Sequence, residues 1–117
     1  MGDFNGDAKL DVIMASGGST VTGGSGLAVS LGNGDGTFTQ GSTSPILLGT
    51  SLSGIVTGDF NGDGKLDLAV TDFSGNAVII LLGNGDGTFG SSVMTAITGP
   101  PVAVGDFNGD GKPDVVV

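Results

Sequence analysis

Aspartate and asparagine recur at fixed offsets in one nonapeptide that occurs three times in the chain. The copies are Asp3–Asp11, Asp59–Asp67 and Asp106–Asp114, and each follows the pattern Asp-Phe-Asn-Gly-Asp-x-Lys-x-Asp. Positions 1, 3, 5 and 9 therefore carry side-chain oxygens, and position 7 offers a backbone carbonyl. Calcium accepts about six to eight oxygens at flexible geometry, whereas magnesium requires a tighter octahedron. The spacing predicts one calcium site in each copy.

Each predicted site has four side-chain ligands and one backbone carbonyl, which belongs to the lysine. The ligands are Asp3, Asn5, Asp7, Lys9 and Asp11; Asp59, Asn61, Asp63, Lys65 and Asp67; and Asp106, Asn108, Asp110, Lys112 and Asp114. Asp-Gly and Asn-Gly clusters also form turns without metal, but a turn requires only about one or two such residues. Four oxygen-bearing side chains at identical offsets exceed that requirement, so we expect up to three Ca²⁺ ions per chain.

Position 6 of the nonapeptide differs between the copies. It is glycine in two of them, Gly64 and Gly111, and alanine in the first, Ala8. Glycine takes positive φ without steric cost as the chain reverses around an ion, whereas alanine loses about 1 kcal/mol there. We therefore expect the Asp3–Asp11 loop to be the weakest of the three sites.

The distribution of charge supports the same interpretation. The chain has three Lys and twelve Asp, for a formal charge of −9, and nine of the aspartates lie in the nonapeptides. Each nonapeptide carries −2, so three Ca²⁺ ions bring the chain to −3. Without metal, clustered carboxylates repel one another and raise each other's pKa. We expect the protein to be less stable when calcium is removed.

Composition excludes most catalytic chemistry. The chain has no His, Cys, Glu, Arg, Tyr or Trp, so only Asp, Lys, Ser and Thr remain for acid–base or nucleophilic work. An Asp-dependent hydrolase is the remaining enzymatic alternative. Its carboxylates are the same ones assigned to calcium, however, and a metal-bound carboxylate is a poor proton shuttle. We expect the chain not to be an enzyme.

Composition also narrows the range of partners. The excess of aspartate over lysine repels phosphate backbones, so we expect no nucleic acid partner. The absence of Cys and His leaves no ligands for a typical zinc site. The apolar run Ala77–Leu82 is six residues long, and a bilayer-spanning helix needs about 20. We expect a soluble chain with no membrane span.

A second motif, Leu-Gly-Asn-Gly-Asp-Gly-Thr-Phe, occurs at Leu31–Phe38 and Leu82–Phe89 and alternates with the nonapeptide. Asn-Gly between apolar runs is a strong hairpin signal, so we interpret Asp35 and Asp86 as turn residues. Between the motifs lie short, β-branched runs that predict strands. They are Leu10–Ala15, Leu27–Leu31, Ile46–Leu48, Ile55–Thr57, Leu66–Thr71, Ala77–Leu82, Val93–Ile97, Val102–Val104 and Val115–Val117.

The repeats predict an all-β chain of four-stranded antiparallel β-propeller blades. The nonapeptides start 56 and then 47 residues apart, and such periods fall in the range of propeller repeats. We divide the chain into a first blade lacking most of its strand one (1–50), a second blade (51–98) and a partial third blade (99–117). The length difference is expected to lie in connections only. The repeated Phe4, Phe38, Phe60, Phe89 and Phe107 are expected to pack between blades.

These motifs resemble the FG-GAP or VCBS-type repeat of integrin-alpha-like β-propellers. The most specific part is Val102–Val115, which Val56–Leu68 matches, and Phe89-Gly90 is similar to the Phe-Gly pair of the family. Phe38-Thr39 departs from that pair. The resemblance implies structural calcium in the nonapeptides and a non-catalytic role in extracellular recognition, adhesion or assembly.

Two further expectations concern ligands and location. Millimolar calcium outside cells suits loops of modest affinity, which indicates an extracellular or cell-surface setting. A protein or glycan ligand is compatible with the resemblance, and a lectin-like propeller is the alternative function. Sugar sites usually use Trp or Tyr platforms, and the chain has neither.

Little more than two blades fit in 117 residues, and propellers usually have about four to eight. We therefore expect either a homo-oligomer that completes a propeller or the neighbouring blades of a longer parent protein. Met1 falls inside a repeat unit, which suggests an excised or engineered fragment. Both ends carry a nonapeptide followed by the same predicted strand, so two copies of one hairpin compete for one place in a closed ring.

Overall fold

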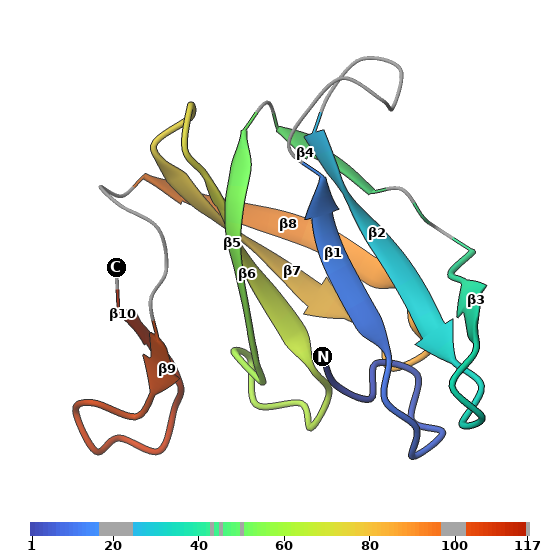
Figure 1. Cartoon of the computed structure of the whole chain (residues 1–117). Coiled ribbons are helices and arrows are strands. Elements are labelled where there is room, and N and C mark those ends of the chain that lie inside the picture. Colours follow the sequence, from blue (N-terminus) through green and yellow to red (C-terminus); the bar gives the residue numbers. More distant parts are fainter. Residues whose placement is uncertain (17–24, 43, 45, 50, 97–102, 117) are drawn as a thin grey trace.

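The computed structural model describes residues 1–16, 25–42, 44, 46–49, 51–96 and 103–116. These residues form ten strands in three antiparallel sheets and no helix (Figure 1). The described part of the chain accordingly contains no helix of the length and hydropathy that a membrane crossing requires. The all-β prediction is confirmed. Ile97, Val102 and Val117, which we placed in strands, lie outside the described residues.

The central sheet is a four-stranded meander in the order of the sequence. Its strands are β5 (Leu52–Gly58), β6 (Asp67–Asp72), β7 (Ala77–Gly83) and β8 (Phe89–Ala96). Every residue of β6 is buried, and β7 is buried at most positions, as expected for apolar runs that do not alternate with polar residues. In contrast, β8 is exposed beyond its first residue and forms an outer edge.

The first sheet repeats this plan with one change. It contains β1 (Val12–Ser16), β2 (Ser25–Gly32), β3 (Phe38–Gln40) and β4 (Ile46–Gly49), and both β3 and β4 pair with β2. Phe38 and Ile46 occupy the places of Phe89 and Thr95 in the central sheet, but lie eight instead of six residues apart. The extra residues divide the last strand in two. Our expectation that insertions lie only in connections was wrong here.

The third sheet is a two-stranded hairpin of β9 (Ala103–Gly105) and β10 (Asp114–Val116). It lies on the side of β5 opposite to β1 (Figure 1). The pairs Gly105↔Asp114 and Gly58↔Asp67 close their nonapeptides identically, and an isolated bridge joins Gly2 and Asp11 in the same way. Each nonapeptide is therefore a hairpin loop, as its sequence predicts.

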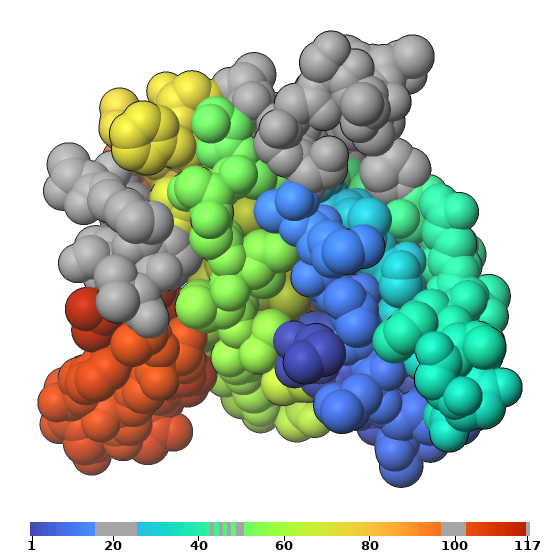
Figure 2. All heavy atoms as spheres, viewed as in Figure 1, coloured from blue at the N-terminus to red at the C-terminus, as the bar shows by residue number. Residues whose placement is uncertain are grey.

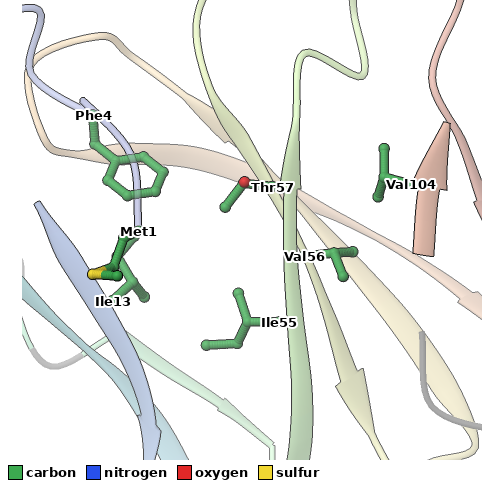
Figure 3. A pocket seen from close by; sticks show the side chains of 7 residues that line it. All are labelled: Met1, Phe4, Ile13, Ile55, Val56, Thr57 and Val104. Atoms are coloured by element: carbon green, nitrogen blue, oxygen red, sulfur yellow. The ribbon is translucent and has the colours of Figure 1, made fainter. Parts of the chain in front are cut away.

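The main hydrophobic core lies between the first and the central sheets. Its buried members are Phe4, Leu27, Leu52, Leu68, Val70, Ile79 and Leu81. A cavity of about 330 Å³ adjoins this core, with lining residues on β1, β5 and β9 (Figure 3). Apart from Thr57, the labelled side chains around it are apolar.

The repeated phenylalanines do not share one environment. Phe4 is only 3% exposed and packs against Phe89 at a ring-centroid distance of 5.9 Å. Phe38 and Phe107 are 52% and 60% exposed, so the expectation that all five pack between blades was wrong for these two. Phe107 has the sequence position of Phe4, which is buried, and Phe38 has that of Phe89, which is partly buried. The difference arises because no neighbouring sheet among the described residues covers Phe38 and Phe107.

Candidate metal loops

The first aspartate of each nonapeptide organises the loop. Asp59 accepts hydrogen bonds from the backbone N–H groups of Gly62, Asp63 and Gly64 at 2.7, 3.0 and 2.8 Å. Asp3 and Asp106 accept the equivalent three N–H groups in their own loops. Three N–H donors on one carboxylate draw the backbone into a tight ring around it, and the three loops share one geometry.

The side chains at positions 3 and 5 continue the same pattern. Asn61 Oδ1 accepts the N–H of Asp63 at 3.1 Å, and Asp63 Oδ1 accepts the N–H of Lys65 at 2.9 Å. The corresponding bonds are present in the other two loops. The lysine side chain approaches position 5, with Lys65 Nζ 4.0 Å from Asp63 and Lys9 Nζ 3.5 Å from Asp7. These exposed ion pairs are worth little on their own.

Position 6 adopts the left-handed conformation in all three loops. The φ angles are 81° at Gly64, 82° at Gly111 and 64° at Ala8. The prediction of positive φ at this position is confirmed. Ala8 therefore holds a backbone conformation that is unfavourable for a residue with a Cβ atom, while the ranking of the three sites by affinity stays a prediction.

The aspartate at position 9 has a structural role that sequence reasoning missed. Asp67 is fully buried, and its two oxygens accept the N–H groups of Phe60 and Gly83, both at 2.8 Å. Asp11 is buried in the same way and accepts from Phe4 and Gly32, at 2.8 and 2.9 Å. The carboxylate thus joins the acidic loop to the start of the second motif in the same sheet.

The third copy makes only half of this connection. Asp114 accepts the N–H of Phe107 at 3.0 Å and is partly exposed. Within the described residues β10 has no partner strand besides β9, so no second-motif glycine reaches this carboxylate. Asp114 is therefore a natural reference for the two buried aspartates.

The glycine that meets the buried aspartate is required by close packing. A Cβ atom at Gly83 would lie 2.1 Å from the carbonyl oxygen of Leu66, and one at Gly32 would lie 2.2 Å from that of Leu10. Neither contact is sterically possible without backbone movement. The Leu-Gly that opens the second motif is the sequence signal for this contact, whereas the Asn-Gly after it predicts only the turn.

Hydrogen bonding keeps the first aspartate ionised in two loops. The pKa of Asp59 is lowered, first by the N–H of Gly64 and then by those of Gly62 and Asp63, against the opposing effect of desolvation. The pKa of Asp106 is lowered in the same way, with Gly111 as the main donor. The expectation that clustering raises the pKa was therefore wrong for both groups, because their N–H donors stabilise the charged form. Both are carboxylates at neutral pH, the form that a cation requires.

The donor set fits calcium in chemistry. Asp11 and Asp67 are fully buried carboxylates, and the ion pairs of the described residues join the lysines to Asp7 and Asp63 instead. Buried carboxylates are normally paired with a cation or bound to a metal. Carboxylate, amide and carbonyl oxygens are the donors that calcium takes, so the residue types of the nonapeptide are compatible with this ion.

The side-chain oxygens of the nonapeptides accept hydrogen bonds from backbone N–H groups. Among the described residues, no three acidic side chains are arranged so that they could hold one metal ion. The physical reason is that positions 1, 3 and 5 face the N–H groups of their own loop, while position 9 faces Phe and Gly N–H groups. A metal would therefore have to draw these oxygens inward from the arrangement described.

The second motif forms a hairpin turn, as its Asn-Gly predicts. Asn33 N–H donates to the carbonyl of Thr37 at 3.0 Å, and Asp35 Oδ1 accepts from the Thr37 hydroxyl at 2.6 Å. The hydroxyl of Thr37 is the main cause of a lowered pKa at Asp35, and Thr88 does the same for Asp86. These aspartates shape turns and lie apart from the nonapeptide carboxylates.

Asp72 is a further aspartate whose role we did not assign from the sequence. It is 9% exposed at the end of β6 and accepts from the N–H of Ser51 and from both the N–H and the hydroxyl of Ser74. Its pKa is lowered, chiefly by the Ser74 hydroxyl. An aspartate two residues before a serine at a strand end is the signature of an Asx-type turn.

Comparison with known protein families agrees with the repeated loops and sheets. The FG-GAP-like repeat matches residues 3–70 and 59–117, two overlapping segments that together span nearly the whole chain. A comparison with curated proteins and a comparison with solved structures each find no match. Repeats of this kind are β-propeller blades, in keeping with the antiparallel sheets. The chain belongs to the FG-GAP-like repeat family.

Proposed function

We propose that the chain is a non-catalytic, calcium-stabilised β-propeller module for recognition, adhesion or assembly outside the cell. The observation that carries the proposal is the repeated buried carboxylate of Asp11 and Asp67, which accepts from two N–H donors and has no ion pair with a lysine in the part of the chain that the structure describes. FG-GAP-like repeats are generally non-catalytic, which supports the same conclusion.

In this proposal each ion is held by the side chains at positions 1, 3, 5 and 9 and by the position 7 carbonyl. The ion supplies positive charge to a loop that carries a formal −2. The loop's own N–H groups order the backbone around Asp3, Asp59 and Asp106, so part of the entropy cost of closing the site is already met. Positions 1 and 9 then connect the ion to the sheet.

The acidic loops also bear on where the module works. Oxygen-rich loops of modest affinity bind calcium at the millimolar concentration found outside cells. Recognition of a protein or glycan would use other surfaces, since the nonapeptide carboxylates hold their own backbone. A setting outside the cell is therefore part of the proposal.

Thermal unfolding of the full chain in calcium and in EDTA tests the central point. A calcium concentration about 100 times the dissociation constant adds about 2.7 kcal/mol for each site. For a domain of this size we expect melting to rise by about 10 °C or more. Magnesium at the same concentration should give a smaller rise, because the flexible loop suits the larger ion.

A matched pair of charge-neutralising variants locates the effect. Asp63→Asn removes a proposed ligand, while Asp86→Asn removes the same charge from a hairpin turn outside the nonapeptides. Isothermal titration should give fewer ions for Asp63→Asn and an unchanged number for Asp86→Asn. Identical melting in calcium and EDTA for the parent chain, with no heat of binding, would refute the calcium role.

A further inference from the structure

The two repeated motifs meet across the boundary between the first and the central sheets. Gly87 N–H donates to the carbonyl of Phe4 at 2.9 Å, and the Phe4 ring packs against Phe89. The approach is close, because a Cβ atom at Gly87 would lie 2.9 Å from Leu31 and 3.6 Å from Asn5. The nonapeptide loop of one sheet is therefore seated on the second-motif turn of the next. We call this contact the loop–turn joint.

Both halves of this joint occur a second time without a partner. The turn of the first sheet ends in Phe38, which is 52% exposed, and a Cβ atom at Gly36 would have no neighbour within 4 Å. The third nonapeptide presents Phe107, which is 60% exposed, whereas the equivalent Phe4 is 3% exposed. The loop 59–67 also meets no second-motif turn among the described residues, but Phe60 is only partly exposed and this loop lies beside residues 111–113 of the third nonapeptide. The chain thus carries one open turn, 33–38, and an open loop, 106–114, whose phenylalanine is largely exposed.

The open turn and the open loop lie at opposite ends of the molecule. β3, which begins at Phe38, is at one edge, and the β9–β10 hairpin that flanks the open loop is at the other (Figures 1 and 2). They cannot meet within one copy. A second copy brings an open loop to the open turn of the first, and the two copies can form the contact reciprocally.

We propose that the turn 33–38 of one copy docks on the loop 106–114 of a second copy and reproduces the loop–turn joint. Gly36 N–H then donates to the carbonyl of Phe107, and the rings of Phe38 and Phe107 pack as those of Phe89 and Phe4 do. This inference deepens the proposed function, because it names the partner and the surface for the assembly that the module is proposed to support.

Burial of apolar surface and added packing favour this docking, and charge repulsion opposes it. The docking removes two largely exposed phenylalanine rings from water, and it adds packing to a two-stranded hairpin, which is marginally stable by itself. Against it stands repulsion between copies that each carry −9, with Asp35 on the turn and Asp106 and Asp110 on the loop. Neutralising or screening these carboxylates should therefore strengthen the association.

Sedimentation and light scattering of the full chain in calcium, over a range of protein concentrations, test the proposal. The parent chain should associate reversibly. Phe38→Ser and Phe107→Ser should each weaken association roughly tenfold or more, as expected for aromatic anchors. The control is Phe73→Ser, since Phe73 is 66% exposed but lies outside both motifs, and it should associate as the parent does.

Mixing the two variants separates specific docking from general stickiness. Neither single variant should self-associate well, but an equimolar mixture restores one intact contact between the Phe38 turn of one partner and the Phe107 loop of the other. The mixture should therefore form heterodimers. A parent chain that stays monomeric, an equal loss for Phe73→Ser, or a mixture that fails to associate would overturn the proposal.

The docking proposal and the calcium proposal can fail independently of each other. Phe38 is not in a nonapeptide, so Phe38→Ser should keep the full melting response to calcium while losing association. A calcium-stabilised monomer would leave the proposed calcium role intact and refute the docking. Association of the parent chain with no melting response to calcium would support the docking and refute the calcium role.

Discussion

The carboxylate of Asp67 accepts the backbone N–H of Gly83 at 2.8 Å, across 16 residues of sequence. Its other oxygen accepts the N–H of Phe60, so one buried side chain fastens both the acidic loop and the second hairpin of the central sheet. Asp11 and Gly32 repeat this relationship in the first sheet. The carboxylate at position 9 therefore stabilises the sheet in its own right, besides its proposed contact with metal.

Asp67→Asn should destabilise the chain even in EDTA. An amide has one acceptor oxygen, so its NH₂ group must face one of the two buried N–H donors, and a lost charged hydrogen bond with an unsatisfied donor costs about 2–3 kcal/mol. Urea unfolding in EDTA measures the change. Asp114→Asn is the control, because Asp114 is partly exposed and accepts one such bond. Equal effects of the two variants would contradict the structural role.

Gly83→Ala should destabilise the central sheet by about 1–3 kcal/mol, the usual range for overpacking. The added Cβ atom would lie 2.1 Å from the Leu66 carbonyl, and the backbone shift that relieves this contact also stretches the bond to Asp67. Gly90→Ala is the matched control, since a Cβ atom there meets nothing closer than 3.5 Å. Denaturant unfolding of both variants should separate them clearly.

Ala8→Gly should stabilise the chain by about 1 kcal/mol, because glycine takes the φ of 64° without a steric penalty. The N–H at position 8 would keep its bond to Asp3. The reciprocal change, Gly64→Ala, should destabilise by a similar amount. Titration should also show tighter calcium binding by the first loop in Ala8→Gly, and a variant that is less stable than the parent would contradict the assignment.

Asp72 should make stability depend on pH in the acid range. Its folded pKa lies below its ordinary value of 3.8, chiefly because the Ser74 hydroxyl donates to the carboxylate. Its contribution is therefore complete above that ordinary value and is lost as pH falls through the lower, folded pKa. Asp72→Asn should be about 1 kcal/mol less stable than the parent at neutral pH.

The difference between Asp72→Asn and its parent should then shrink as the pH falls below 3.8. Unfolding in EDTA at a series of pH values measures it. Asp86→Asn should show the same trend, because the pKa of Asp86 is also lowered, chiefly by the Thr88 hydroxyl. A difference that grows on acidification would reverse the sign of the argument.

The sequence alone determined the local structure of this protein. The period of the nonapeptide, its four oxygen-bearing positions and the glycine at position 6 predicted three similar hairpin loops with one backbone geometry, since these depend on residues within nine positions of one another. Apolar run lengths likewise predicted an all-β chain, and each strand overlaps one of those runs except β3, which no predicted run covers.

Only the tertiary structure decided what joins one repeat to the next. The partner of Asp67 is a glycine 16 residues away, and Phe4 packs on Phe89 although both belong to motifs that look alike in every copy. Phe38 and Phe107 have the sequence positions of Phe89 and Phe4, yet both lie largely exposed, because burial depends on which sheet stands beside a residue. Contacts between segments distant in sequence leave no local pattern, so the arrangement in space had to decide them.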